Sequence, residues 1–453
     1  MNHSCERMSY VFVFPIPRRL CTPWYLLILG LLLGGVACHP TSGDEHTPTL
    51  VFKHPRLLSD EEPLRMLLDQ FRAAHPDIHL REEVLPSSSD QQHLFYVTNL
   101  EAGSSDFDVF ALDVIWIPEF ARAGWLQDVT PRVEPAALAD FVTGPVDAAT
   151  HAGRLYAIPW FLDAGVLYYR RDLLDKYALA PPRTWSELRN AAQIVMRGEA
   201  NPRLTGFVWQ GKQYEGLVCV ALEFIRAYGG EVFSRDGELQ LVRPPTITGL
   251  QHLRRLITDH ISPPVVTTAD EETARLIFGH GEAIFMRNWP YAWRLLNTEG
   301  SLVRGRVGVT AIPGSDTHSG VPTLGGWHLG INRLSPQPDL AWQLVAFLTS
   351  AESQRQLAVT SGLRPTRLSV YADPRVQQAD PSLSLFFPLL QRAQPRPVTP
   401  FYLMASTVLQ SELSAIITGL KSAEAAMDDS ERQLRRILAL DRREGDHAST
   451  AKQ

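Results

Sequence analysis

Apolar and polar residues alternate along the chain with two different periods. Short apolar runs, typical of strands, occur at residues 79–83, 108–112, 166–169, 282–286 and 329–331. Apolar residues recur at helical spacing over residues 64–71, 118–123, 184–196, 217–228, 338–348, 407–418 and 430–440. Strands that alternate with helices are typical of α/β folds, and we expect the sheets to be mostly parallel.

Several residues mark where these helices begin and end. Thr184 and Glu187 are spaced as in a capping box, which predicts a helix start. Gly229 and Gly419 each follow a helical pattern and are expected to end it, because glycine tolerates the left-handed conformation of a helix C-cap. Pro290 suits the first turn of a helix after the strand at 282–286.

The N-terminal segment has the pattern of a secretory signal. Arg18 and Arg19 precede an uncharged apolar run at residues 24–37, which is shorter than the ~20 residues that a membrane-spanning helix needs. The run ends in small residues directly before Cys38, as in the lipobox of bacterial lipoproteins, where this cysteine receives the lipid. Gly35 stands where lipoboxes usually carry Leu, so ordinary signal cleavage and a retained anchor helix remain alternatives.

The remaining chain divides into a short polar tether at residues 38–48, a long folded region, and a polar tail at 441–453 that we expect to be flexible. Cys5 and Cys21 belong to the segment to be removed, and Cys38 would carry lipid. This leaves Cys219 alone in the mature chain, so no disulfide framework is expected. Its apolar neighbours predict a buried core thiol rather than a nucleophile.

Composition and charge exclude several classes of function. Of the 453 residues, 45% are hydrophobic and 20% are charged, which is globular composition, and a net charge of −6 argues against a basic nucleic-acid surface. Residues 206–213 match the Gly and Lys spacing of a phosphate-binding loop, but Gln213 replaces the Ser or Thr that would bind Mg²⁺. We therefore expect no nucleotide, cofactor or metal, and we expect His328 to be packed or solvated.

Distinctive aromatic and acidic residues fall at the ends of predicted strands, which include a further run at residues 156–159. They are Asp113, Phe161, Asp163, Trp289, Tyr291 and Trp327, with Gly326 beside the last. In open α/β sheets ligands bind outside the carboxyl ends of strands, which makes this location a functional hint. Aromatic rings suit the apolar face of a sugar, carboxylates accept from its hydroxyls, and Arg364 would donate in a planar fork.

Structural alternatives exist for each of these residues. Trp289 and Trp293 are one helical turn apart and could both be core, Asp113 could only cap a helix, and Arg364 could only form an ion pair. A secreted glycan hydrolase is the enzymatic alternative, but it would need two carboxyl groups converging on one cleft, and no spacing in the sequence selects such a pair.

The motifs, in their order along the chain, resemble family 1 extracellular solute-binding proteins of bacterial ABC importers. The motifs are FDVFALDVIW (107–116), FARAGWL (120–126), AIPWFLDAGVLYYRRDLL (157–174), PRTW (182–185), GFVWQGKQYEGL (206–217), GEAIFMRNWPYAW (281–293), GGW (325–327) and SGLRPT (361–366). The segment at 206–217 looks like the trehalose/maltose-binding branch. The resemblance runs from about residue 64 to residue 440.

This resemblance implies roles for individual residues. Positions that match Asp113, Asp163, Glu215 and Arg364 are polar ligand contacts in the branch. Those that match Trp289, Tyr291 and Trp327 form an aromatic floor, with the Gly326 backbone beside it. Phe161 stands where relatives often have Tyr, which removes one hydroxyl from the pocket. The N-terminal contacts of the family do not align, because residues 53–60 depart from the common pattern.

The resemblance also implies a fold and a mechanism. We expect a two-lobed periplasmic-binding-protein-like fold of type II, with residues 49–163 and 324–366 in lobe 1 and residues 164–323 and 367–440 in lobe 2. A di- or oligosaccharide would close the lobes about hinge crossovers near residues 163, 323 and 366. The implied protein is a monomeric, lipid-anchored receptor outside the cytoplasmic membrane that serves an ABC permease and is not an enzyme. A receptor for a non-sugar solute is the remaining alternative.

Overall fold

The computed structural model describes residues 47–57, 61–86, 88–234 and 238–450, with side chains described as far as residue 438. By their contacts, the described residues from Thr47 onward belong to one unit. The predicted signal peptide, Cys38 and the tether up to residue 46 lie outside the described residues.

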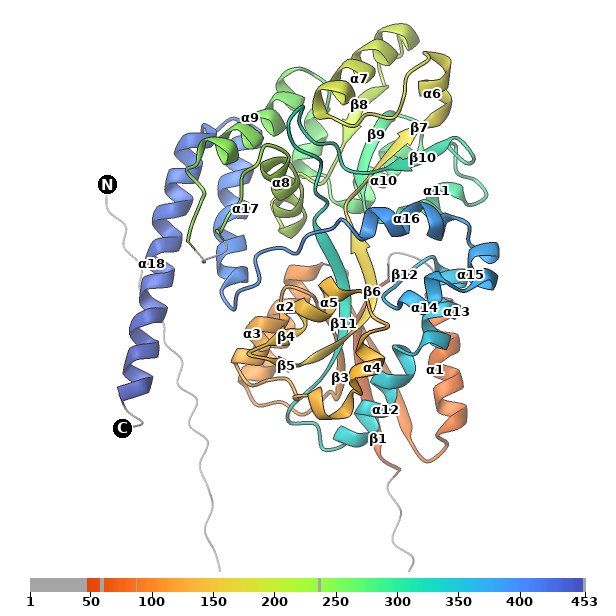
Figure 1. The fold of residues 1–453 in the computed structure, drawn as a ribbon, viewed down its shortest axis with the longest axis vertical. Coiled ribbons are helices and arrows are strands. Elements are labelled where there is room, and N and C mark those ends of the chain that lie inside the picture. The colour runs from red at the N-terminus through yellow and green to blue at the C-terminus, as the bar shows by residue number, and fades with distance from the viewer. Residues whose placement is uncertain (1–46, 58–60, 87, 235–237, 451–453) are drawn as a thin grey trace, which may run out of the picture. The chain divides into compact units, whose positions relative to one another are not determined.

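Two sheets organise the described part of the chain (Figure 1). The larger has the strand order β12-β6-β11-β3-β1-β2 and the smaller the order β10-β7-β9-β8. The larger sheet contains β1 (Thr49–Pro55), β2 (His79–Leu85), β3 (Val109–Asp113), β6 (Ala157–Ala164), β11 (Leu324–Ile331) and β12 (Arg364–Pro365). The smaller contains β7 (Val166–Arg170), β8 (Thr205–Val208), β9 (Ala283–Asn288) and β10 (Val307–Thr310). A short hairpin joins β4 (Thr150–His151) and β5 (Arg154–Leu155).

The prediction of mostly parallel sheets is wrong. Parallel pairing joins β1 to β2, β1 to β3 and β8 to β9, whereas β11 is antiparallel to both β3 and β6, and β7 is antiparallel to both β9 and β10. The apolar pattern of a strand records which faces are buried but not the direction of its neighbour. The sheets are therefore mixed, although the strands lie close to their predicted positions.

One hydrophobic core packs around the larger sheet. It includes residues of β1, β3, β6 and β11 together with helices from the first part of the chain and from residues 338–361. The helices are α1 (Glu62–Ala74), α2 (Ser89–Glu101), α3 (Ile117–Arg122), α4 (Pro135–Leu138), α5 (Thr143–Ala148), α12 (Pro338–Leu348) and α13 (Ala351–Ser361), with a 3₁₀ turn η1 (Thr130–Arg132). In α1, Leu64, Leu67, Leu68 and Phe71 are buried at spacings of three and four residues, as the helical pattern predicts.

A second core packs around the smaller sheet. Its helices are α6 (Arg171–Lys176), α7 (Trp185–Glu199), α8 (Glu215–Ala227), α9 (Pro244–Thr258), α10 (Glu271–Gly279), α11 (Ala292–Asn297), α14 (Leu368–Tyr371), α15 (Pro374–Ala379), α16 (Ser382–Leu390), α17 (Tyr402–Thr418) and α18 (Ala423–Thr450), with a 3₁₀ turn η2 (Pro264–Thr268). The capping box at Thr184 is confirmed, since Glu187 N donates to Thr184 Oγ1 at 3.1 Å. Gly419 ends α17 with φ 82°, also as predicted.

The helix α18 is longer than the sequence pattern predicts. It begins at Ala423 rather than at residue 430, and its backbone is helical to Thr450, through much of the segment that was expected to be a flexible tail. Met427 and Leu434 bury apolar side chains, and Arg435 pairs with Glu431 one turn earlier. Polar residues of high helix propensity therefore extend a helix beyond its last apolar contacts.

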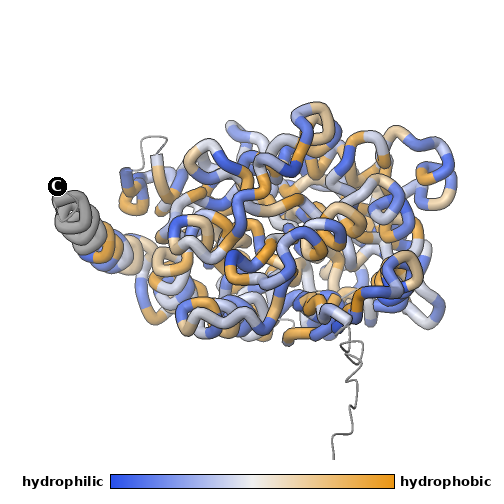
Figure 2. The backbone as a smooth tube through the Cα atoms, turned by 90° about the horizontal axis from the view of Figure 1, so that it is seen from below, coloured by the Kyte–Doolittle hydropathy of each residue, from blue (hydrophilic) through white to orange (hydrophobic). Residues whose placement is uncertain are grey.

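Within the described residues, no helix combines the length and the apolar character that a membrane crossing requires. Apolar and polar positions alternate along the backbone in Figure 2 instead of forming long apolar runs. This alternation is what helices with one buried face produce.

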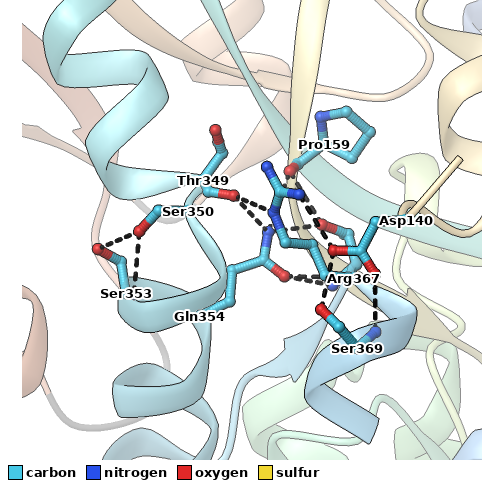
Figure 3. A network of polar contacts seen from close by, with 9 residues as sticks. Asp140, Pro159, Thr349, Ser350, Ser353, Gln354, Arg367 and Ser369 are labelled. Atoms are coloured by element: carbon cyan, nitrogen blue, oxygen red, sulfur yellow. Dashed lines mark hydrogen bonds and ion pairs between the residues drawn. The ribbon is translucent and has the colours of Figure 1, made fainter. Parts of the chain in front are cut away.

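Three connections lead from one sheet to the other. The first is Gly165, between β6 and β7; the second is the segment 311–323, between β10 and β11; the third follows β12. At the third, Gln354 Oε1 accepts from the backbone N–H groups of Thr366 (2.8 Å) and Arg367 (3.1 Å), and Arg367 pairs with Asp140 (Figure 3). The lobe boundaries proposed from the sequence, near residues 163, 323 and 366, stay a prediction.

Candidate functional site

A cavity of about 570 Å³ is lined by residues from both sheets. Its walls come from the ends of β1, β3, β6 and β9, from the start of β11, and from the starts of α2, α8 and α10. Eight of the nine residues predicted from the sequence line it: Asp113, Phe161, Asp163, Glu215, Trp289, Tyr291, Gly326 and Trp327. The strand-end argument therefore gathers most of its residues in one place.

Three of these residues form a row across the larger sheet. Asp113 is the last residue of β3 and lies opposite Trp327 in β11, which in turn lies opposite Phe161 in β6. Residues directly opposite each other in antiparallel strands share a face of the sheet. The row places a carboxylate and two aromatic rings side by side on one wall of the cavity.

Gly326 allows the two strands behind this row to come together. Its φ is +121°, and a Cβ added there would lie 2.6 Å from the backbone oxygen of Phe161. Only glycine tolerates both the conformation and the close approach. The role predicted for the Gly326 backbone as part of a ligand site stays a prediction.

The opposing wall carries aromatic rings whose polar atoms are tied to α10. Trp289 Nε1 donates to Glu271 Oε1 at 3.2 Å, and Tyr291 OH donates to Glu272 Oε1 at 2.7 Å. Tyr214 OH donates to the other oxygen of Glu271 at 2.7 Å. These bonds fix the ring edges, so the ring faces are what the wall offers to a bound molecule.

Trp293 differs from its neighbour Trp289. Its ring meets Phe386 edge-on at 5.9 Å, and it packs against the core of the smaller sheet. Trp293 is absent from the cavity lining, whereas Trp289 is part of it. The core alternative weighed for both tryptophans thus holds for Trp293.

Asp163 is a carboxylate without a hydrogen-bond donor among the described residues. It lies near the end of β6 and remains partly accessible from the cavity. Burial raises its pKa to about 7, and the charges of Arg364 and Arg287 oppose this rise. Asp163 is therefore an acceptor in this site whose capacity is left for a bound molecule.

Arg396 is a cavity residue that the sequence analysis missed. Its side chain is buried, and its guanidinium donates to Asp113 Oδ1 (2.7 Å) and to Glu215 Oε1 (2.9 Å). Asp113 ends a strand of the larger sheet, and Glu215 begins α8 beside the smaller sheet. Arg396 thus joins the two halves of the cavity, and its Nε–H lacks a partner within the described structure.

The structure does not bring Arg364 to the cavity. The guanidinium is buried, with Nη1 donating to Asp380 Oδ2 (2.9 Å) and Nη2 donating to Ser382 Oγ (3.2 Å). It also covers the ring of Phe386 at 4.3 Å. Arg364 is therefore an ion-pair partner, which was the structural alternative to a ligand contact. Asp380 binds its guanidinium outside the cavity.

Glu215 lines the cavity with its carboxylate already engaged. Besides Arg396, Tyr402 OH donates to it at 2.7 Å and Ser406 Oγ also donates to it. A carboxylate with this many donors has little capacity left for another molecule. The geometry therefore favours a role for Glu215 in holding Arg396.

Further cavity residues were outside the predicted set. They are Pro55, Arg56, Leu57, Ser88, Ser89, Asp90, Gln91, Lys212, Gln213, Tyr214, Gly216, Cys219, Asp270, Glu271, Glu272, Gly325 and Leu363. The strand-end rule could have found Arg56 and Leu57, since they directly follow β1. No local signal marks Arg396, which stands between two prolines in the loop from α16 to α17.

Two residues set aside in the sequence analysis are buried, as expected. Cys219 is a free, buried cysteine, and burial raises the pKa of its thiol, which keeps it protonated and unreactive. His328 is buried with Nε2 at 3.0 Å from the oxygen of Pro145, and burial lowers its pKa to about 4. No group of three or more metal-ligating side chains occurs in the part of the chain that the structure describes.

The fold defines a class of protein: a two-lobed α/β fold with a cavity lined by residues from both of its main sheets. Residues 57–355 match the family described as bacterial extracellular solute-binding protein, which is more than half of the chain. The chain therefore belongs to this family, and the resemblance found in the sequence is confirmed.

Relatives extend the match over most of the chain. A probable ABC transporter-binding protein of Deinococcus radiodurans is 38% identical over 360 residues, which cover 78% of this chain and 85% of the relative. A maltotriose-binding protein of Pyrococcus abyssi is 25% identical over 365 residues, covering 78% and 73%. The structure of maltose-bound MalE3 of T. maritima superposes with a TM-score of 0.81 at 40% identity, covering 86% of this chain and 99% of that one.

Proposed function

We propose that this chain is the extracytoplasmic receptor of an ABC transporter and that it captures a di- or oligosaccharide of the trehalose/maltose kind. The observation that carries the proposal is the composition of the cavity. Aromatic rings from both sheets line it together with Asp163, a carboxylate with no donor among the described residues. The names of the relatives, which include a maltotriose-binding protein and a maltose-bound structure, support the same ligand class.

Sugar recognition would divide between rings and charges. The C–H face of a pyranose stacks on Trp289 or Trp327, while its hydroxyls donate to Asp163 and accept from the free Nε–H of Arg396. A bound hydroxyl without a partner costs ~1–3 kcal/mol, which is how such a cavity distinguishes one sugar from another. Arg396 takes the donor role that the sequence analysis gave to Arg364.

Capture would proceed by hinge closure. A ligand that touches residues of both lobes stabilises the arrangement in which the lobes approach each other. The closed receptor would then dock on the permease subunits of the transporter and release the sugar to them. We propose that this chain supplies recognition only and catalyses no reaction itself.

We further propose export and anchoring by lipid. The segment 1–37 would act as the signal peptide, and Cys38 would be the lipid-bearing first residue of the mature protein. Mass spectrometry of the mature N-terminus tests the anchor, and an unmodified chain beginning elsewhere would contradict it.

Calorimetric titration of the mature protein with maltose, maltotriose, trehalose, sucrose and mannitol is the direct test. At least one of these should bind with a dissociation constant of about 1 μM or tighter, which corresponds to about −8 kcal/mol. Failure of the whole panel would contradict the sugar class. Amino acids and polyamines serve as the control panel, and binding of one of these alone would identify a receptor of another class.

The same incubations separate a receptor from a hydrolase. After prolonged contact with the protein, each sugar should be recovered intact by chromatography. Released monosaccharide would favour the hydrolase alternative.

Asp163 gives the binding a predicted pH dependence. With a pKa of about 7, the group is mostly ionised at pH 8 and mostly protonated at pH 6. If the carboxylate is the form that accepts from the sugar, affinity should fall by up to about tenfold between these pH values, because charge-assisted hydrogen bonds are the stronger ones. The Asp163→Asn protein should bind more weakly at pH 8 and show a flat profile by calorimetry. An unaltered pH profile in that variant would assign the dependence to another group.

The stability of the same variant should change in the opposite sense. Because the folded-state pKa lies above the unfolded value of 3.8, the folded protein holds this proton more tightly, and stability falls as pH rises from about 4 to 7. Asp163→Asn removes this cost, so its melting temperature at pH 8 should exceed that of the unaltered protein. The residue would thus trade stability for binding.

A further inference from the structure

Arg287 is a buried arginine directly beside the cavity but not part of its lining. It belongs to β9 and has no exposed surface. Its Nε and Nη2 donate to the two oxygens of Glu223 at 3.1 and 2.7 Å, and its Nη1 donates to Gln210 Oε1 at 3.2 Å. Each of the three guanidinium nitrogens therefore donates to a side chain of the protein, and Arg287, being fully buried, lies outside the cavity lining.

The guanidinium instead covers one face of Trp289. Its central carbon lies 4.0 Å from the centroid of the Trp289 ring, a cation–π contact made by a fully buried guanidinium. The ring edge is held by Glu271, and a Cβ added to Gly325 would lie 3.1 Å from the ring. Because Arg287 covers one face of the Trp289 ring and Glu271 binds its Nε1, we expect the opposite face to be the surface that meets a ligand.

The partner of Arg287 contacts both of the first two connections between the sheets. Glu223 lies in α8 and is 1% exposed, and its Oε1 accepts from the backbone N–H of Thr323 at 3.2 Å. A Cβ added to Gly165 would collide with the same carboxylate and would lie 2.6 Å from Arg287 Nη2. Gly165 N also donates to Thr323 O at 3.2 Å, which joins the two connections at this point.

We propose that the Glu223–Arg287 pair is a positioning pair for sugar binding, which backs the Trp289 ring and ties it to the two connections that pass between the lobes. The pair touches no ligand and acts through Trp289. A buried ion pair is seldom the most stable way to fill a core, so a positional role accounts for it better than stability does. This inference rests on the proposed function.

The double substitution Glu223→Leu with Arg287→Met tests the pair without leaving an unpaired charge. It should melt above either single variant, because no unpaired charge is left, but below the unaltered protein, because Thr323 N–H and Gln210 Oε1 each lose a buried partner. Calorimetric affinity for maltose should nevertheless fall at least tenfold, since the ring loses its backing. Affinity equal to that of the unaltered protein would overturn the proposal.

A second protein background, Trp289→Leu, distinguishes a positioning role of the pair from a general loss of fold stability. In Trp289→Leu protein, which has no ring to position, the same double substitution should weaken maltose binding by less than about twofold. An equal fold-loss in both backgrounds would show that the pair does not act through Trp289 and would overturn the proposal.

Glycine variants make the test independent of whether the double substitution folds. Gly165→Ala should displace the pair and weaken maltose binding at least tenfold. Gly144→Ala is the matched control, because its added Cβ would meet only Leu324 Cδ2 at an ordinary 3.7 Å. Equal affinities of the two alanine variants would contradict the proposal. If the unaltered protein itself does not bind maltose, the proposal that maltose is a ligand is wrong. The positioning role inferred for the pair, which rests on that proposal, is then wrong as well.

Discussion

Replacement of Arg396 by Met is expected to lower the free energy of unfolding by about 3–5 kcal/mol, the cost of removing one partner from a buried ion pair. Arg396 is 4% exposed and binds Asp113 and Glu215 at once. Without it, two buried carboxylates from opposite sides of the cavity face each other with no positive charge between them. Denaturation in urea, followed by circular dichroism, measures the loss.

A surface arginine supplies the matched control. Arg435 pairs with Glu431 across one helical turn, and its side chain is 57% exposed. Arg435→Met should therefore cost less than about 1 kcal/mol, since exposed pairs contribute little. If Arg396→Met were as stable as Arg435→Met, the ion pairs of Arg396 with Asp113 and Glu215 would contribute nothing to the stability of the fold.

The stability lost in Arg396→Met can be tested further by removing the charge of one of the two carboxylates. Adding Glu215→Gln to Arg396→Met should restore part of the lost stability, because the amide oxygen can still accept from Tyr402 and the amide nitrogen can donate to Ser406 Oγ, without an unpaired charge. A double variant no more stable than Arg396→Met would place the cost elsewhere, for example in lost packing of the arginine stem.

The sequence could predict the cavity residues that follow apolar strands. Asp113, Phe161, Asp163 and Trp289 stand at or just beyond such runs, whereas Trp327 lies near the start of β11, which meets the ends of β3 and β6 because it is antiparallel to both. Each of these residues is marked by its neighbours in the sequence, and folding then brings them together. The same reasoning would have found Arg56 and Leu57 had it been applied to β1.

Arg364 and Arg396 show what the sequence could not predict. Arg364 follows a motif that the family resemblance singled out, yet Asp380 and Ser382 bind its guanidinium away from the cavity. Arg396 has no motif and reaches Asp113, 283 residues earlier in the chain, only through tertiary folding. Which buried arginine meets which carboxylate depends on long-range packing that no local pattern records. The same holds for strand direction, because the antiparallel pairing of β6 with β11 joins segments that are far apart in sequence.

Replacement of Trp289 by Ala is expected to weaken sugar binding by about 30-fold or more, since truncating a central aromatic contact typically costs ~2 kcal/mol or more. The free face of this ring borders the cavity, and the ring is fixed by Arg287 and Glu271 before any ligand arrives. A platform that is already ordered contributes to affinity without a further entropic cost. Calorimetric titration with maltose measures the change.

Trp293, four residues later, provides a control that distinguishes loss of a sugar-contacting ring from loss of core packing. Trp293→Ala removes a ring that packs against Phe386 and is outside the cavity lining, so it should lower the melting temperature while leaving affinity within about threefold. Sugar should quench or shift tryptophan fluorescence in the Trp293→Ala protein but much less in the Trp289→Ala protein, because only the latter lacks the contacting ring. The reverse pattern, with binding lost at Trp293 and kept at Trp289, would move the sugar away from the wall built by β9 and α10 and would remove the observation on which the proposed function depends.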